Sequence, residues 1–146
     1  MPLKWPCARK ATGSISMTGN SVLLDSSVIV RHFRNAEAVS DKLAAFEELY
    51  VPQTALGELY YGAFKSARFE ENLEKIEQFL VAVYVLGADN ETALQYGKIA
   101  AQLARDGTPI PQNDIWIAAV AVQCGVPLAT TDEHFRRVEG LNVLFW

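Results

Sequence analysis

Short apolar runs alternate with helical patterns along most of this chain, and that alternation limits its possible folds more than any other feature. Strands that alternate with helices form parallel sheets, and strands that are apolar throughout need helices on both faces of the sheet. The sequence therefore predicts an α/β fold with three layers, α/β/α, around a central, mostly parallel sheet of four to five strands. The predicted strands are 22–24, 49–51, 81–86, 126–130 and 143–145, and the predicted helices are 28–33, 36–48, 52–64, 69–80, 91–105, 113–124 and 132–138.

Length and composition favour one globular domain. The chain has 146 residues, of which 50% are hydrophobic and 21% are charged. No apolar run approaches the ~18 residues that a membrane-spanning helix needs. The only two cysteines lie far apart and form no CxxC pattern, which excludes a zinc–thiolate site and a disulfide scaffold by number. This cysteine usage favours a reducing, cytoplasmic setting.

Residues 1–20 differ from the rest of the chain. They contain three basic residues and no acid, and their apolar residues follow no helical or strand period. We expect a flexible N-terminal extension here, with the folded domain in residues 21–146. An upstream start, with Met17 as the true first residue, is the alternative interpretation.

Local signals predict where several elements begin and end. Ser26 and Ser27 have the side chains of helix caps, Asn113 is the expected cap of the helix that reaches Cys124, and Gly125 is its expected stop. In the helix that begins at Pro52, helical spacing predicts a buried face made of Leu56, Leu59, Tyr60, Ala63 and Phe64.

Four acidic residues stand at the ends of predicted strands or at helix positions that could face those ends. Asp25 directly follows the first strand, Asp132 follows the fourth, Asp114 lies at the start of a helix, and Glu58 lies inside the helix after the second strand. Each has an ordinary interpretation on its own. These are a turn residue for Asp25, an N-cap for Asp132, a helix-dipole contact for Asp114 and a solvated face for Glu58.

Taken together, the four acids indicate a metal site. Ligands of open α/β sheets bind beyond the carboxyl ends of the strands. Two carboxylates 4 Å apart repel each other by about 4 kcal/mol at an effective dielectric constant near 20. Such a cluster therefore needs protons or cations, and ligation by oxygen alone favours Mg²⁺ or Mn²⁺ over zinc. The net charge of −4 disfavours a broad nucleic-acid surface, so any contact with nucleic acid must come from a local group of cations.

Four blocks of the sequence resemble the PIN-domain ribonucleases, and among them the VapC-type toxins of bacterial toxin–antitoxin pairs. The resemblance extends over residues 22–146 with all blocks in order. It implies a PIN-like fold with Asp25, Glu58, Asp114 and Asp132 as the metal-binding and catalytic residues. The blocks are LLDSSV at 23–28, VP and ELYYG within 51–62, NDIWIAA at 113–119 and TTD at 130–132.

The resemblance also implies supporting residues and a reaction. Ser27, Asn113 and Thr130 match polar positions that support the acids in the family. The implied activity is hydrolysis of RNA by a water activated by Mg²⁺ or Mn²⁺, with 5′-phosphate and 3′-hydroxyl products. Asp25 and Asp114 would be the principal metal ligands. The implied partners are RNA, a second copy of the chain in a homodimer, and a small antitoxin that inserts an arginine or similar group into the acidic cleft. The N-terminal extension departs from the family pattern.

Several basic residues are candidates for RNA contacts. They are Arg31, Arg34, Lys65 and Arg68. Lys65 follows Glu58 by seven residues and so shares its helix face, with Gly62 between them leaving room for a close approach. Solvated surface charge is the alternative interpretation of each. The two histidines, His32 and His134, are predicted to be helix-surface or packing residues.

Two other functions compete with the ribonuclease. A haloacid-dehalogenase-like phosphohydrolase would use Asp25 as a covalent nucleophile, but Ser27 stands where those enzymes carry a second aspartate. A catalytically silent binding module could use the acidic cleft only to hold a partner. The presence of all four acids disfavours that second alternative.

Overall fold

The computed structural model describes residues 20–146, so the prediction of a flexible extension over residues 1–20 falls, except for Asn20, outside the described part. The strands form a single five-stranded sheet in the order β3-β2-β1-β4-β5, and every neighbouring pair is parallel. The predicted parallel sheet is therefore confirmed. The strands are β1 (Ser21–Leu24), β2 (Glu48–Pro52), β3 (Tyr84–Leu86), β4 (Leu128–Thr130) and β5 (Val143–Phe145).

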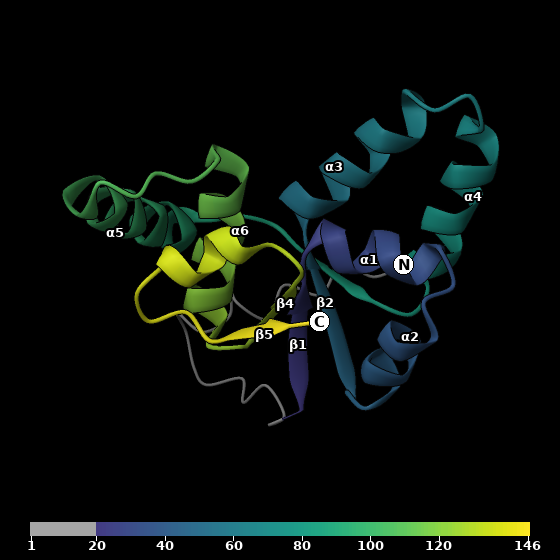
Figure 1. Ribbon diagram of the computed structural model, residues 1–146, viewed down its shortest axis with the longest axis horizontal. Helices are drawn as coiled ribbons and strands as arrows, with labels where there is room; N and C mark the ends of the chain where they lie inside the picture. Colours follow the sequence, from purple (N-terminus) through teal and green to yellow (C-terminus); the bar gives the residue numbers. More distant parts are fainter. Residues whose placement is uncertain (1–19) are drawn as a thin grey trace.

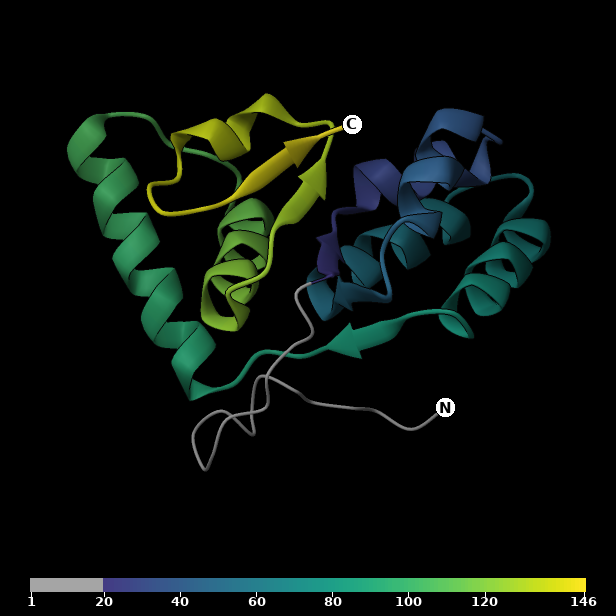
Figure 2. The same cartoon turned by 90° about the horizontal axis from the view of Figure 1, so that it is seen from below.

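Helices flank the sheet in two groups (Figures 1 and 2). Helices α1 to α4 lie on one side of the molecule, and α5, α6 and the short 3-10 helix η2 lie on the other. The helices are α1 (Ser26–Phe33), α2 (Glu37–Ala44), α3 (Gln53–Phe64), α4 (Phe69–Leu80), α5 (Asn90–Asp106), α6 (Gln112–Cys124) and η2 (Glu133–Arg137). Within residues 20–146, none of these helices is long and apolar enough to cross a bilayer.

The core lies around the central strand and α6. Val22, Leu23 and Leu24 of β1 are completely buried, as expected for the central strand of a parallel sheet whose faces are covered by helices. In α6, Ala118 and Ala119 are also completely buried, and their small side chains allow close packing. The carboxyl end of β1 therefore lies in the middle of the protein, and Asp25 directly follows it.

Three predicted elements are shorter than expected because of bonds that local patterns do not reveal. The helix predicted over 36–48 ends at Ala44, since Asn20 donates a side-chain hydrogen bond to the carbonyl of Ala45 and β2 begins at Glu48. Residues 81–83 continue the turn that closes α4, so β3 begins only at Tyr84. The strand predicted over 126–130 begins at Leu128, because the Val126 N–H bonds the carbonyl of Ala121 and closes the α6 terminus.

The predicted helix caps are partly wrong. Asp25, not a serine, is the N-cap residue of α1, and Pro111 rather than Asn113 is the N-cap residue of α6. Gly125 does end α6, with a φ of 64° in the left-handed region that suits glycine.

The predicted buried face of α3 holds only in part. Leu59 and Ala63 are buried as predicted, but Phe64 is 66% exposed. Helix α3 rises away from the sheet towards its carboxyl end (Figure 1), so its last residue extends beyond the core.

Candidate active site

Asp25 is a buried carboxylate held by two hydroxyl groups. It follows β1 directly, and its exposed fraction is 5%. Ser27 and Thr130 each donate a hydrogen bond of 2.8 Å to its Oδ2 atom. Ser27 comes from the first turn of α1 and Thr130 from the end of β4, so the carboxylate is attached to two neighbouring elements. Both residues therefore lie where the family resemblance places supporting groups.

Glu58 reaches the same end of the sheet from α3. The hydroxyl of Ser26 donates a hydrogen bond of 2.6 Å to Glu58 Oε2, and the glutamate is half-buried. The side chain therefore points towards the segment after β1 rather than into bulk solvent. Sequence reasoning missed Ser26 as a partner of Glu58, because a serine at a helix start has the pattern of a cap. Its position directly after Asp25 was the one available signal.

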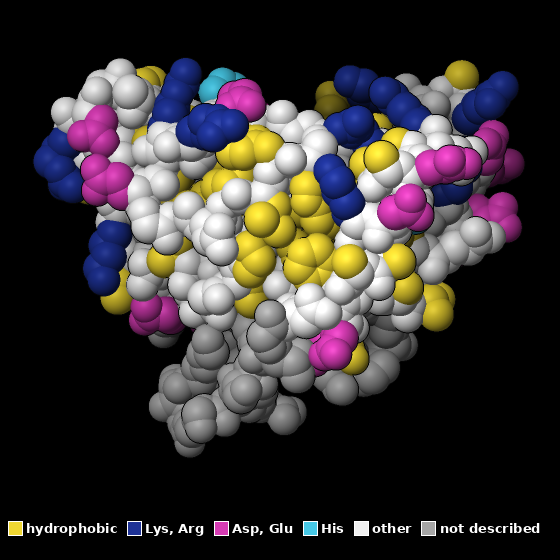
Figure 3. Space-filling model, turned by 60° about the horizontal axis from the view of Figure 1, so that its bottom comes forward, with side chains coloured by type: hydrophobic (Ala, Val, Ile, Leu, Met, Phe, Trp, Pro, Cys, Tyr) yellow, Lys and Arg dark blue, Asp and Glu magenta, His cyan; other side chains and the backbone are white. Residues whose placement is uncertain are grey.

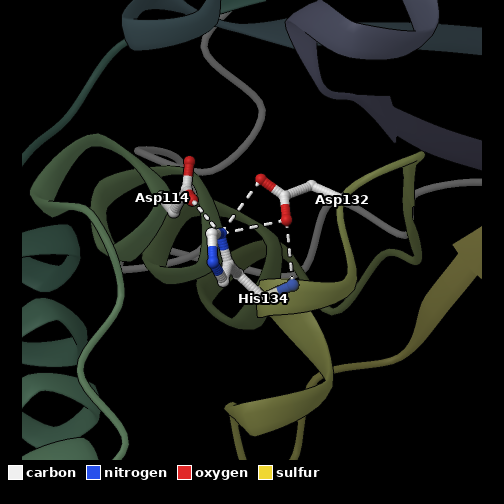
Figure 4. A group of neighbouring side chains, drawn as sticks. All are labelled: Asp114, Asp132 and His134. Atoms are coloured by element: carbon white, nitrogen blue, oxygen red, sulfur yellow. Dashed lines mark hydrogen bonds and ion pairs between the residues drawn. The ribbon is translucent and has the colours of Figure 1, made fainter.

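Asp114 and Asp132 face each other across a histidine (Figure 4). His134 Nδ1 lies 3.0 Å from Asp132 Oδ1 and 3.8 Å from Asp114 Oδ2. Asp114 belongs to the first turn of α6, whereas Asp132 is the N-cap residue of η2 and accepts the backbone N–H of His134. His134 is partly exposed on η2, as predicted for a helix-surface residue, but the prediction missed its contacts with the two acids. The spacing Asp-x-His in a tight turn was the signal for them.

Burial and neighbouring carboxylates raise the pKa of two of the four acids, Asp114 and Asp25. Burial and the charges of Asp132, Asp25 and Glu58 raise the pKa of Asp114 to about 6, against a smaller opposing effect of His134. Burial also raises the pKa of Asp25, although the bonds from Ser27 and Thr130 favour its charged form. The fold thus brings together all four acids that the sequence singled out.

The other predicted site residues lie at the margin. Asn113 is exposed beside Asp114 at the start of α6. Arg31 donates a hydrogen bond of 2.7 Å to the carbonyl of Trp146, which fastens this arginine to β5 and its end. Lys65 lies over the ring of Tyr61 at 5.1 Å, and Arg68 lies 3.8 Å from Glu71.

The charges of the surface are unevenly distributed in Figure 3. Lysine and arginine side chains gather along the upper edge on the side of α1 to α4, and apolar side chains occupy the middle of this face. A groove of about 360 Å³ also lies between α1, α3 and α4 and begins at Glu58. Apolar residues such as Val30, Phe33 and Leu59 line it together with the cations Arg34 and Lys75.

His32, the second histidine, is a packing residue as predicted. Its ring lies 5.7 Å from the ring of Phe79 and 6.1 Å from that of Phe33. Its Nδ1 atom lies 3.0 Å from the hydroxyl of Ser40. The two histidines therefore occupy different environments, an aromatic cluster for His32 and the acidic site for His134.

Comparison with known proteins identifies the family that the sequence blocks resemble. Residues 22–141 match the PIN domain family. The chain is 33% identical over 130 residues to Ribonuclease VapC1 of Haemophilus influenzae (strain R2866), covering 85% of this chain and 96% of the relative. It is 37% identical over 97 residues to the tRNA(fMet)-specific endonuclease VapC of Salmonella typhimurium, covering 66% of this chain and 74% of that protein.

A solved structure shows the same fold. The crystal structure of VapBC2 from Rickettsia felis bound to a DNA fragment from their promoter superposes with a TM-score of 0.83 at 24% identity, covering 86% of this chain and 98% of that one. The fold, the matched domain and the curated relatives agree with the resemblance seen in the sequence blocks. The chain therefore belongs to the PIN-domain family and, within it, to the VapC ribonuclease toxins of toxin–antitoxin pairs.

Proposed function

We propose that this chain cleaves RNA by metal-assisted hydrolysis, with Asp25, Glu58, Asp114 and Asp132 as the metal-binding and catalytic residues. The observation that carries this proposal is the convergence of the four acids: burial, together with the charges of Asp132, Asp25 and Glu58, raises the pKa of Asp114 to about 6. A cluster that disfavours its own negative charge to this degree is suited to bind cations.

The donor set fits Mg²⁺ or Mn²⁺. All four acids offer carboxylate oxygens, which these hard ions prefer. When bound, such ions lower the pKa of a water and stabilise the attacking and leaving oxygens of the phosphodiester. Cleavage then leaves 5′-phosphate and 3′-hydroxyl ends.

The protein's own residues position these carboxylates. Ser27 and Thr130 orient Asp25 through hydrogen bonds to one of its oxygens, and Ser26 orients Glu58. Asp25 and Asp114 are both more buried than Asp132 and are the principal ligands in this proposal, and Asp132 and Glu58 complete the site. Asn113 is assigned a supporting role at the start of α6.

The test is incubation of the purified chain with total RNA and Mn²⁺, followed by mapping of the cut ends. We expect the wild type to cut and Asp25→Asn to fold normally but not cut. Glu91→Gln is the matched control, because it removes one negative charge at the first turn of α5. Full cleavage by Asp25→Asn would refute the proposal.

The ribonuclease family replaces the two alternatives raised by the sequence, a haloacid-dehalogenase-like phosphohydrolase and a silent binding module. In the structure, Ser27 is bonded to Asp25 and occupies the position where the phosphohydrolases need a second aspartate. A covalent role for Asp25 is therefore not part of this proposal.

Lys65 and Arg68 are the proposed RNA contacts of this chain. Both are exposed at the turn that joins α3 to α4, beyond the end of the helix that carries Glu58. Arg31 is a weaker candidate, since its guanidinium already donates to Trp146. Lys65→Ala should raise the KM for RNA by about 2–5-fold and flatten its salt dependence, whereas Lys98→Ala on α5 should not. Equal effects of the two substitutions would contradict this assignment.

A small antitoxin is the proposed protein partner, and the groove between α1, α3 and α4 is its proposed binding site. A chain in the VapBC2 structure from Rickettsia felis has the same fold. An apolar segment fits the apolar lining of the groove, and a cationic group at its end could reach the acids past Glu58. We further propose a homodimer that acts in the cytoplasm, where RNA is available. Light scattering of the purified chain checks the dimer.

A further inference from the structure

We propose that His134 supplies a nitrogen ligand to the metal site and thereby makes the site prefer Mn²⁺ to Mg²⁺. This inference rests on the proposed function only in placing a divalent ion beside Asp114 and Asp132. It adds a residue that the four-carboxylate scheme does not contain.

The geometry suits shared ligation. One ligand atom each of Asp114, Asp132 and His134 can be chosen so that all three lie within 4.8 Å of one another. Ligands bound at about 2.1 Å from a six-coordinate ion lie roughly 3 to 4.2 Å apart. The distances of 3.0 and 3.8 Å from His134 Nδ1 to the two carboxylates fall in this range.

The tight turn of η2 fixes the imidazole in place. The backbone N–H of His134 donates 2.9 Å to Asp132 Oδ1, and the backbone N–H of Asp132 donates 3.0 Å to the buried hydroxyl of Thr130. These two bonds place the side chains of Asp132 and His134 on the same side of the turn, as Figure 4 shows. Little rearrangement is then needed before both side chains can bind one ion.

The imidazole is accessible to an arriving ion. Its side chain is 43% exposed, compared with 13% for Asp114. A neutral imidazole can bind an ion through Nδ1 while Nε2 carries the ring proton. Nδ1 faces both carboxylates, so an ion held by Asp114 and Asp132 would also lie next to this nitrogen.

A ligand and a simple ion-pair partner have different consequences. Mg²⁺ binds oxygen and keeps several of its waters, whereas first-row transition ions also accept imidazole nitrogen. Loss of a nitrogen ligand therefore weakens Mn²⁺ binding much more than Mg²⁺ binding. Loss of a residue that only balances charge alters the binding of both ions to the same degree.

Calorimetric titration of the metal-free protein with MnCl₂ and with MgCl₂ tests this difference. For His134→Ala we expect Mn²⁺ affinity to fall by about tenfold or more and Mg²⁺ affinity to stay within about twofold. His32→Gln is the control, because His32 packs against Phe33 and Phe79 instead of the acids. Unchanged Mn²⁺ binding, or equal losses for both ions, would overturn the proposal.

A spectroscopic measurement detects the bond itself. Because the chain has two histidines, ¹⁵N-histidine labelling marks only His32 and His134. Pulsed EPR of the Mn²⁺-loaded protein should show a directly coordinated nitrogen that changes with the label in wild type and His32→Gln and is absent in His134→Ala. Wild-type protein without this coupling would refute ligation by His134.

The two proposals can fail separately. RNA that is cut in Mn²⁺ by a protein without nitrogen coupling leaves the ribonuclease intact and refutes the ligand. Nitrogen coupling in a protein that leaves RNA uncut supports the ligand and refutes the cleavage mechanism.

Discussion

The two halves of the acidic site are held by different forces. Asp25 and Glu58 accept hydrogen bonds from hydroxyl groups at 2.6 to 2.8 Å. Asp114 and Asp132 instead face each other and His134, and the nearby negative charges help raise the pKa of Asp114 to about 6.

The hydrogen bonds hold Asp25 and Glu58 in place without an ion, whereas the arrangement of Asp114 and Asp132 depends on cations. Hydroxyl donors stabilise a carboxylate without any ion, and bonds of this kind to a charged group contribute about 1.5–3 kcal/mol each. Repulsion between carboxylates costs free energy until a cation or proton relieves it. We infer that metal binding stabilises the α6 and η2 side of the site most.

The largest effect is expected from removing the charge of Asp114. Asp114→Asn should lower the rate of cleavage at least about 100-fold. Loss of a residue that only hydrogen-bonds a metal ligand typically costs less than this. At pH 7 and without metal, the same change should raise the melting temperature, because it removes repulsion with three acids. Differential scanning fluorimetry with and without Mn²⁺ checks this, with Glu91→Gln as control. A lower melting temperature for Asp114→Asn without metal would contradict the proposal that charge repulsion distinguishes this half of the site.

Stability without metal should depend on pH through the same residue. The pKa of Asp114 in the folded protein is about 6, above the ~3.9 of an aspartate in the unfolded chain. The folded protein therefore binds the proton more tightly, and the free energy of unfolding falls as the pH rises from about 4 to about 6. The loss is on the order of 1–3 kcal/mol and persists above pH 6.

Urea denaturation at pH 5 and pH 7.5 measures this loss. Acids outside the site titrate alike in wild type and Asp114→Asn, so the difference between the two proteins isolates Asp114 together with its interactions with Asp132, Asp25 and Glu58. Parallel stability curves for the two proteins would show that charge repulsion is not what distinguishes this half of the site.

Thr130 joins the two halves, and its hydroxyl should matter to both. It is completely buried, donates to Asp25 and accepts the backbone N–H of Asp132. Thr130→Val keeps the shape but leaves both partners without this hydroxyl, at a cost of about 1–3 kcal/mol. Cleavage should fall with it. Thr130→Ser retains the hydroxyl and should restore most of the activity in the same assays. A serine variant as inactive as the valine variant would count against a hydrogen-bonding role.

The smallest effect is expected at Gln102 of α5, which hydrogen-bonds residues at the end of η2 and so supports the α6 and η2 side of the site. This buried side chain donates to the carbonyl of Arg137 and accepts the N–H of Glu139, while Arg137 donates to the carbonyl of Pro109. Gln102 thus ties α5 to the end of η2 and the residues that follow, and Arg137 ties the end of η2 to the turn before α6. Gln102→Ala should cost about 1–2 kcal/mol and lower cleavage a few-fold, most at low Mn²⁺.

Gln123 provides the matched control for Gln102. Its amide donates to Asp89 and its carbonyl accepts from Thr92, so it links α5 to the opposite end of α6. Gln123→Ala should lower stability without changing the Mn²⁺ requirement for cleavage. An equal shift in that requirement would mean that any loosening of α5 and α6 disturbs the site.

Much of the architecture could be predicted from local patterns. The bounds predicted for α4 and β5 agree with the structure, because amphipathic spacing and a short apolar run with clear ends are properties of neighbouring residues. The parallel sheet followed from the alternation of strands and helices. Asp25 and Asp132 could be proposed because they follow parallel strands, and Asp114 and Glu58 because they stand on helices at positions that could face those strand ends, where the topology gathers side chains.

Tertiary contacts decided what the local patterns could not. Ser26 and Ser27 have the sequence of helix caps, yet their hydroxyls bond Glu58 and Asp25. A capping hydroxyl only accepts a backbone N–H, which is a weak local preference, whereas a nearby carboxylate is a strong acceptor for the hydroxyl proton. His134 joins the site because η2 turns it towards Asp114, a residue 20 positions earlier in the chain.

The sequence alone thus determined which elements form and which chemical groups stand at their ends. Only the folded structure decided which of those groups meet, as the bond between Thr130 and Asp25 across 105 positions illustrates. The physical reason is that hydrophobic period and turn residues act over a few neighbours, whereas hydrogen bonds and charge repulsion act between whatever side chains packing brings within a few ångströms.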